Sequence, residues 1–156
     1  MIEIGQIVPE FSLPAVGSEE IKLSDYRGKK LVIYFYPKDM TPGCTQQACD
    51  FRDSESYFMT KNAAVIGISA DDVKSHEKFG AKYDLPFPLL SDTEHTVSEA
   101  FGVWQLKKNF GKEYEGIVRS TFLLDEEGRL IREWRKVKVE GHVEEVLQAV
   151  DEASKE

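Results

Sequence analysis

The two cysteines of the chain lie five residues apart, in the stretch Pro37–Cys49 (PKDMTPGCTQQAC). This stretch follows Leu31–Tyr36, a run that is apolar at every position and predicts a buried strand, and it leads into a segment with helical spacing. A cysteine in the first turn of a helix meets unpaired N–H groups and a partial positive charge, which favour its thiolate form. The thiolate is the nucleophile, so the pattern predicts a reactive thiol at Cys44.

The helix end alone is too weak to make such a thiol reactive. Free cysteine titrates near pH 8.5, and lowering that value by about two units takes about 2.7 kcal/mol. A helix N-terminus contributes about 0.3 to 1 kcal/mol, and up to ~2 kcal/mol when partly buried. A cation or further hydrogen bonds must supply the remainder. Thr41 is placed as an N-cap, Pro42 suits the first helical position, and Pro37 can fix the exit from the strand and shield the site.

Cys49 is too far along the helix to pair with Cys44 while the helix is intact. Five residues rise about 7.5 Å and turn roughly 500°, which puts the two Cα atoms about 8 to 9 Å apart. A disulfide needs about 4.4 to 6.8 Å. The spacing therefore fits either two independent thiols or a switch in which the first turns unwind. Gly43 would ease such unwinding.

Composition narrows the functions that the chain can have. Its 156 residues fit one domain spanning residues 1–156, and the net charge of −8 argues against a general nucleic-acid surface. It has no apolar run long enough to span a membrane, and its first residues lack the features of a signal peptide. We therefore expect a cytoplasmic protein. In that reducing compartment two cysteines are more often redox-active or metal-binding than joined in a permanent disulfide.

The order of the predicted elements indicates an α/β fold. We expect an extended or hairpin-like start over 7–14 and 20–23 with a turn at Gly17–Ser18, a helical turn near 24–27, strands at 31–36, 63–69, 89–91, 118–125 and 129–137, and helices at 41–60, 73–83, 91–101 and 143–153. The Lys-rich segment 103–116 is interpreted as a long mobile loop. Helices between strands predict a three-layer α/β/α, thioredoxin-like domain with a mixed central sheet and an N-terminal extended or hairpin extension. A dinucleotide fold is disfavoured because no G-x-G-x-x-G follows the first strand.

The cysteine stretch resembles a known signature. Pro37-x3-Thr41-x2-Cys44 matches the P-x-x-x-T-x-x-C pattern of the peroxiredoxins, and Cys49 five residues later resembles the peroxiredoxin Q, or bacterioferritin comigratory protein, subgroup. The resemblance extends over essentially the whole chain. It implies that Cys44 attacks a peroxide, that Thr41 and Arg119 hold the peroxide oxygens, and that Pro37 shields the site. It also places Gly43 among the substrate-binding residues.

The resemblance implies a complete catalytic cycle. Cys44 would reduce hydrogen peroxide or an organic hydroperoxide and become a sulfenic acid, which Cys49 would convert into an intramolecular disulfide. A thioredoxin-like or glutaredoxin-like dithiol would then reduce that disulfide. No metal or organic cofactor is implied, and the subgroup favours a monomer, with a weak dimer as the alternative. Arg119 begins a strand expected beside Leu31–Tyr36, where a fixed guanidinium would stabilise the thiolate and the leaving oxygen.

Other interpretations remain at this stage. If Cys49 is simply a buried apolar residue, the chain is a one-cysteine peroxidase that needs an external resolving thiol. A thioredoxin-type oxidoreductase requires Cys-x-x-Cys, but Gln47 stands three residues after Cys44. A non-enzymatic holdase or interaction module leaves the combination of Thr41, Cys44 and Arg119 unexplained. A zinc site would need ligand spacing that His76, His95 and His142 lack.

Overall fold

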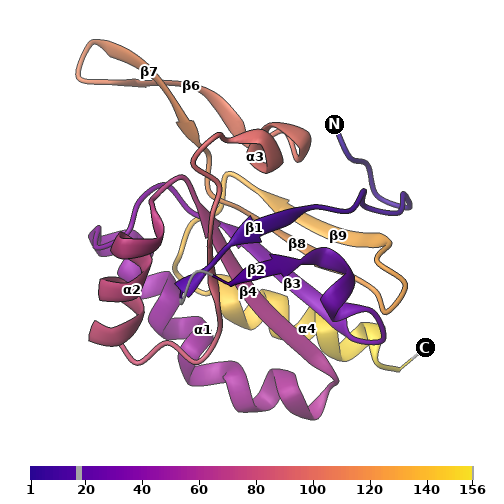
Figure 1. Ribbon diagram of the computed structural model, residues 1–156. Helices are drawn as coiled ribbons and strands as arrows, with labels where there is room; N and C mark the ends of the chain where they lie inside the picture. Colours follow the sequence, from indigo (N-terminus) through magenta and orange to yellow (C-terminus); the bar gives the residue numbers. More distant parts are fainter. Residues whose placement is uncertain (17–18, 156) are drawn as a thin grey trace.

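The computed structural model, which describes residues 1–16 and 19–155, is built on a five-stranded sheet with the strand order β5-β4-β3-β8-β9 (Figure 1). The elements in chain order are β1 (Ser12–Pro14), β2 (Glu20–Lys22), a 3-10 turn η2 (Leu23–Tyr26), β3 (Lys30–Phe35), α1 (Pro42–Thr60), β4 (Ala63–Ser69), α2 (Val73–Lys82), β5 (Leu89–Ser91), α3 (Thr96–Ala100), β6 (Trp104–Asn109), β7 (Lys112–Ile117), β8 (Ser120–Leu124), β9 (Leu130–Arg135) and α4 (His142–Ala153).

Strand β3 lies at the centre of the sheet and is buried along its whole length. It pairs in parallel with β4, which pairs in parallel with β5, and it pairs antiparallel with β8 on its other side. The antiparallel hairpin of β8 and β9 completes the sheet. The predicted mixed sheet is confirmed, with β3 in the central position that its uninterrupted apolar sequence indicated.

The alternation of side chains along β3 divides the interior into two hydrophobic cores. Leu31, Ile33 and Phe35 point to one face, which is covered by the N-terminal segment, η2 and α3. Val32 and Tyr34 point to the other face, where they pack against α1, α2 and α4. The result is the expected thioredoxin-like arrangement of three layers. Its second outer layer is a mixture of extended chain and short helices (Figure 1).

The segment 103–116 corrects one prediction. It forms no loose loop but two paired strands, β6 and β7, joined at Phe110–Gly111, where both residues have positive φ angles of 52° and 77°. Such a two-residue connection matches the twist of a hairpin. Most of its side chains are exposed on both faces, so the sequence lacks the alternation that marks a half-buried strand. The hairpin extends away from the body of the molecule (Figure 1).

A smaller difference concerns the start of a helix. The helix expected to begin at Ser91–Glu94 begins only at Thr96, because His95 adopts a left-handed conformation and the Asp92 carboxylate accepts hydrogen bonds from the amides of Val97 and Ser98. At the N-terminus β1 and β2 form the small antiparallel hairpin that was one of two possibilities. The turn predicted at Gly17–Ser18 lies outside the described residues.

Candidate active site

The end of β3 and the start of α1 place Cys44 at a strand–turn–helix junction. The chain leaves β3 at Phe35, turns through residues 37–40, and enters α1 at Pro42 with Thr41 in the N-cap position. The Thr41 hydroxyl makes no capping bond to the helix and donates instead to the carbonyl of Lys38 at 2.8 Å. The predicted position of Thr41 is therefore confirmed, while its hydroxyl stabilises the turn that precedes the helix.

The Cys44 thiol is almost completely buried and lies beside Arg119. Its side chain belongs to the core between the sheet and the helices, and Nη2 of Arg119 is 3.2 Å from Sγ. Arg119 directly precedes β8, and the register of β8 against β3 sets Ser120 opposite Phe35. That register brings a residue 75 positions away to the first turn of α1. The expectation that Arg119 lies beside the cysteine stretch is confirmed.

Gln47 holds the other arm of the same guanidinium. Nη1 of Arg119 donates to Oε1 of Gln47 at 2.6 Å, and Gln47 is fully buried. Cys44 and Gln47 are three residues apart, so they lie on one face of α1 and meet the two arms of the fork together. Sequence reasoning gave Gln47 no role. The signal that could have found it is this helical spacing, because a fixed cation needs a second acceptor to set its orientation.

A glycine allows the close approach of the guanidinium. A β-carbon built on Gly43 would lie 3.2 Å from Nη2 of Arg119, which is tighter than ordinary van der Waals contact. Gly43 therefore leaves the space through which Arg119 reaches Sγ of Cys44. The sequence suggested that Gly43 eases unwinding of the helix. Its close packing against Arg119 is a second, independent reason for a glycine at this position.

The surroundings of the thiol form a region of low polarity. Tyr34, in the same core cluster, is completely buried, and its hydroxyl has no hydrogen-bond partner among the described residues. Burial raises the pKa of Tyr34 well above its ordinary value, and the nearby Cys44 adds to that shift. Charges interact more strongly in such surroundings than in water. The Arg119 guanidinium therefore acts on the Cys44 sulfur with little screening.

Cys49 lies further along α1 and is only half-buried. Both cysteines are free thiols, and both lie within one continuous helix, as the spacing argument required. Cys49 does not belong to the buried core, unlike Cys44. Cys49 is therefore more accessible than Cys44.

Comparisons with known proteins decide the family. Residues 4–133 match the AhpC/TSA family, and the chain is 61% identical over 153 residues to peroxiredoxin Bcp of Bacillus subtilis, covering 98% of each chain. The chain is a peroxiredoxin. Among solved structures, the peroxiredoxin Q of Xylella fastidiosa is 40% identical with a TM-score of 0.94, covering 99% of this chain and 98% of that one. The bacterioferritin comigratory protein of Xanthomonas campestris is 44% identical with a TM-score of 0.88, covering 92% of both chains, and was studied for alkyl peroxide reduction.

As a peroxiredoxin of the Q group, the chain is a thiol peroxidase that contains two cysteines. The resemblance found in the sequence is thereby confirmed. The thioredoxin-type oxidoreductase and the non-enzymatic module are set aside. None of the described helices is long and apolar enough to cross a membrane.

A second polar cluster, which sequence reasoning missed, supports the turn before Cys44. The buried Asp39 carboxylate accepts from the hydroxyls of Tyr36 at 2.6 Å and Ser75 at 2.8 Å, and lies 2.7 Å from Nδ1 of His76. Nε2 of His76 faces the carbonyl of Leu90 at 3.0 Å. Asp39, Asp71 and His76 have ligand atoms within 4.8 Å of one another, but both ring nitrogens of His76 already face oxygen acceptors. The peroxiredoxin thus uses this cluster to fix its turn.

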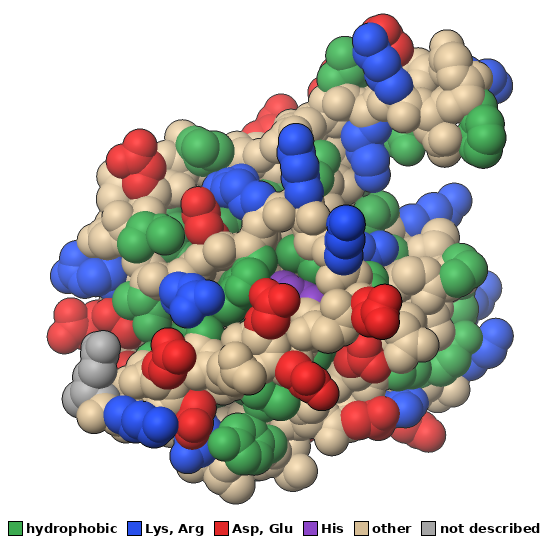
Figure 2. Space-filling view, turned by 180° about the vertical axis from the view of Figure 1, so that it is seen from behind, with side chains coloured by type: hydrophobic (Ala, Val, Ile, Leu, Met, Phe, Trp, Pro, Cys, Tyr) green, Lys and Arg blue, Asp and Glu red, His purple; other side chains and the backbone are tan. Residues whose placement is uncertain are grey.

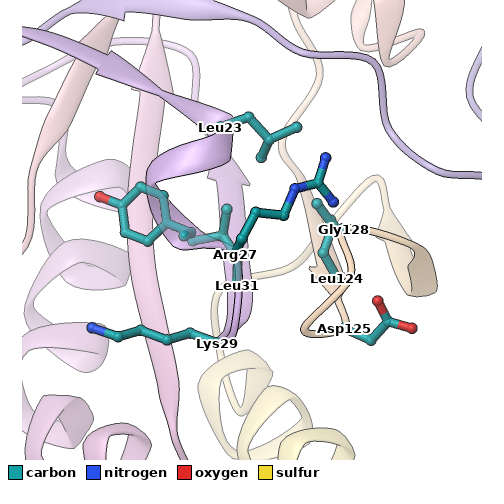
Figure 3. Close-up of a pocket in the computed structure, with 8 residues that line it drawn as sticks. Leu23, Arg27, Lys29, Leu31, Leu124, Asp125 and Gly128 are labelled. Atoms are coloured by element: carbon teal, nitrogen blue, oxygen red, sulfur yellow. The ribbon is translucent and has the colours of Figure 1, made fainter.

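Two further features lie outside the site of this peroxiredoxin. His142, at the start of α4, is within 2.8 Å of the Thr121 hydroxyl, and burial together with the charge of Arg119 lowers its pKa to about 4. A pocket of about 10 Å³ between η2 and the β8–β9 turn lies at the opposite end of β3 (Figure 3). It has room for about one water molecule, which is too little for a substrate.

Proposed function

We propose that Cys44 is the cysteine that attacks the peroxide and that Arg119 is the residue that activates it. The single observation that carries this assignment is the 3.2 Å contact between Nη2 of Arg119 and Sγ of Cys44 in a buried, weakly polar setting. A guanidinium at that distance favours the thiolate, and the start of α1 adds a smaller effect of the same sign. The helix end alone is too weak to make the thiol reactive, and Arg119 supplies the cation that is needed in addition.

The chemical step follows from this arrangement. The Cys44 thiolate attacks one peroxide oxygen, a sulfur–oxygen bond forms, and the oxygen–oxygen bond breaks. The leaving oxygen takes the electron pair and a proton and departs as water or an alcohol, which leaves a sulfenic acid on Cys44. Arg119 stabilises the negative charge that grows on the leaving oxygen. Thr41 and Gly43, which precede Cys44 at the start of α1, contact the peroxide, and Pro37 excludes water.

The second half of the cycle uses Cys49. Its thiol attacks the sulfenic acid of Cys44, so that a disulfide forms and water leaves. Because both cysteines lie in α1 at a separation that a disulfide cannot span, the first turns of α1 must unwind for this step. Because Cys49 is only half-buried, few packing contacts must be broken for its side chain to move toward Cys44.

An external dithiol of the thioredoxin or glutaredoxin type then restores both thiols by exchange. The substrates are hydrogen peroxide and organic hydroperoxides. The alkyl peroxide activity studied in the Xanthomonas campestris protein supports the second class.

Peroxide consumption in the presence of a dithiol reductant tests these assignments. The parent chain, Cys44→Ser and Cys49→Ser are compared under identical conditions. Cys44→Ser should lose turnover, and Cys49→Ser should consume one equivalent of peroxide per chain before it slows, because its sulfenic acid has no internal partner. Turnover that survives Cys44→Ser would overturn the assignment of the attacking thiol. Unchanged turnover in Cys49→Ser would show that this residue does not resolve the sulfenic acid.

A further inference from the structure

The guanidinium of Arg119 has two acceptors in the site, and neither of them is a carboxylate. Nη2 donates to Sγ of Cys44 at 3.2 Å, and Nη1 donates to Oε1 of Gln47 at 2.6 Å. In the part of the chain that the structure describes, no Asp or Glu lies within ion-pair distance of Arg119, whereas other arginines form such pairs. Of its two acceptors, the Cys44 sulfur is therefore the one that can carry the balancing negative charge.

The carboxamide of Gln47 leaves one of its two polar groups unpaired. Gln47 is completely buried, and its Nε2 has no hydrogen-bond partner among the described residues. A buried N–H group without an acceptor lowers stability. A glutamate of the same size would have no such donor, and its carboxylate would bind the guanidinium more strongly than an amide oxygen does. The property that the amide has and the carboxylate lacks is neutrality.

A charge at position 47 would act directly on the thiol. Cys44 and Gln47 are three residues apart on α1, so they lie on one face of the helix, and both contact the same guanidinium. Figure 2 shows acidic side chains gathered over the lower half of one face of the molecule, but exposed charges of this kind are screened by water and salt. A buried carboxylate at position 47 would be screened far less. It would neutralise Arg119 and repel a thiolate.

The other titratable groups around the thiol do not take over this role. Burial raises the pKa of Tyr34 on β3 well above its ordinary value. Burial and the charge of Arg119 lower the pKa of His142, at the start of α4, to about 4. Both side chains are therefore uncharged near neutral pH. Burial and the charge of Arg119 also lower the pKa of Lys107 on β6, and this lysine is the same in every variant compared below.

We propose that Gln47 is a positioning residue whose neutrality sets the reactivity of Cys44. Its amide fixes the guanidinium of Arg119 without neutralising it, so the full positive charge acts on the sulfur. A side chain of the same shape with a negative charge would hold Arg119 equally well and make the thiol less reactive at neutral pH. This inference rests on the proposed roles of Cys44 and Arg119.

Gln47→Glu tests the inference, because glutamate has the size of glutamine and keeps an oxygen for Nη1 of Arg119. The rate at which Cys44 reacts with iodoacetamide is measured from about pH 4 to 10, in chains that all carry Cys49→Ser so that one thiol is followed. Gln47→Glu should move the midpoint of the profile to higher pH by about 1 to 2 units, which slows alkylation below the midpoint about ten- to a hundredfold. Near pH 10, where the thiol is ionised in every variant, the rates should agree within about twofold.

Gln46→Glu is the matched control. It makes the same chemical change at the preceding residue, whose exposed amide bonds to Asp50, and it should leave the midpoint unchanged. An equal shift in both variants would indicate a diffuse effect of surface charge and would overturn the inference.

An unchanged or lower midpoint in Gln47→Glu would also overturn it. So would a loss of rate at all pH values with no change of midpoint, because that result would assign Gln47 a merely structural role. If Gln47→Glu does not fold, Gln47→Asp, which carries the same charge on a smaller side chain, is measured with the same expectations. Failure of the proposed function is seen separately, as peroxide turnover by Cys44→Ser.

Discussion

Gly43 and Arg119 are packed so closely that a β-carbon on Gly43 would lie 3.2 Å from Nη2 of Arg119. Gly43→Ala should therefore displace the guanidinium by a few tenths of an ångström and weaken its contact with Cys44. We expect kcat/KM for peroxide to fall about tenfold, because small misplacements in an active site are costly. Steady-state kinetics measures the effect.

Gly80 provides the control for this substitution. It lies inside α2, and a β-carbon there would meet nothing within 4 Å. Gly80→Ala should leave the kinetics unchanged and raise the free energy of unfolding by about 0.5 to 1 kcal/mol, since alanine favours the helix. Equal activity in Gly43→Ala and the parent would show that the close packing of Arg119 is unimportant.

Gln47 should be needed for activity although it does not contact the sulfur. Gln47→Leu removes the acceptor that holds Nη1 of Arg119 at 2.6 Å, so the fork can rotate away from Cys44. We expect kcat/KM to fall about ten- to a hundredfold, with a smaller change in stability. The control is Gln46→Leu, since the Gln46 amide bonds to Asp50 in an exposed position. Similar kinetics for the two variants would contradict the role given to Gln47.

The buried cluster around Asp39 should make a large contribution to stability. Asp39→Ala leaves His76 and the hydroxyls of Tyr36 and Ser75 without their acceptor in the interior. Each buried polar group left without its partner costs about 1 to 3 kcal/mol, so the loss of these three contacts should cost about 3 to 5 kcal/mol in total. Urea unfolding should show such a loss for Asp39→Ala, but less than about 1 kcal/mol for Asp53→Ala, whose carboxylate is 67% exposed. A small effect of Asp39→Ala would mean that the turn is held by other contacts.

His142 should make stability depend on pH. Its pKa is about 4 in the folded chain and about 6.5 when unfolded, so the unfolded chain binds more protons between these values. The free energy of unfolding therefore falls as pH falls from about 6.5 to 4, and this loss amounts to about 2 to 3 kcal/mol at the lower end. Urea unfolding at pH 7 and 4.5 should show a smaller pH dependence for His142→Gln than for the parent. The same dependence in both chains would contradict this account.

Much of this arrangement could be predicted from the sequence because local patterns determine it. The apolar run of β3, the Thr41-Pro42 helix start and the position of Cys44 are all readable from neighbouring residues. What could not be predicted depends on contacts between distant segments. The role of Gln47 can be recognised only once Arg119 is known to lie beside it. The role of His76 likewise depends on the position of Asp39.

The β6–β7 hairpin was missed for a different reason. Its strands are exposed on both sides, so they lack the periodic burial that marks a strand in sequence. Its Lys-rich composition therefore resembles that of a loop.

The most direct test of the central claim is the mass of the chain after one equivalent of hydrogen peroxide, measured without a reductant. If Cys44 attacks and Cys49 resolves, the chain should become about 2 Da lighter, and the change should lie in the tryptic peptide Asp39–Arg52, which holds both cysteines. Cys49→Ser should instead gain about 16 Da on Cys44. An oxidised parent chain that keeps both thiols free, or that forms disulfide-linked dimers in place of the internal bond, would contradict the account.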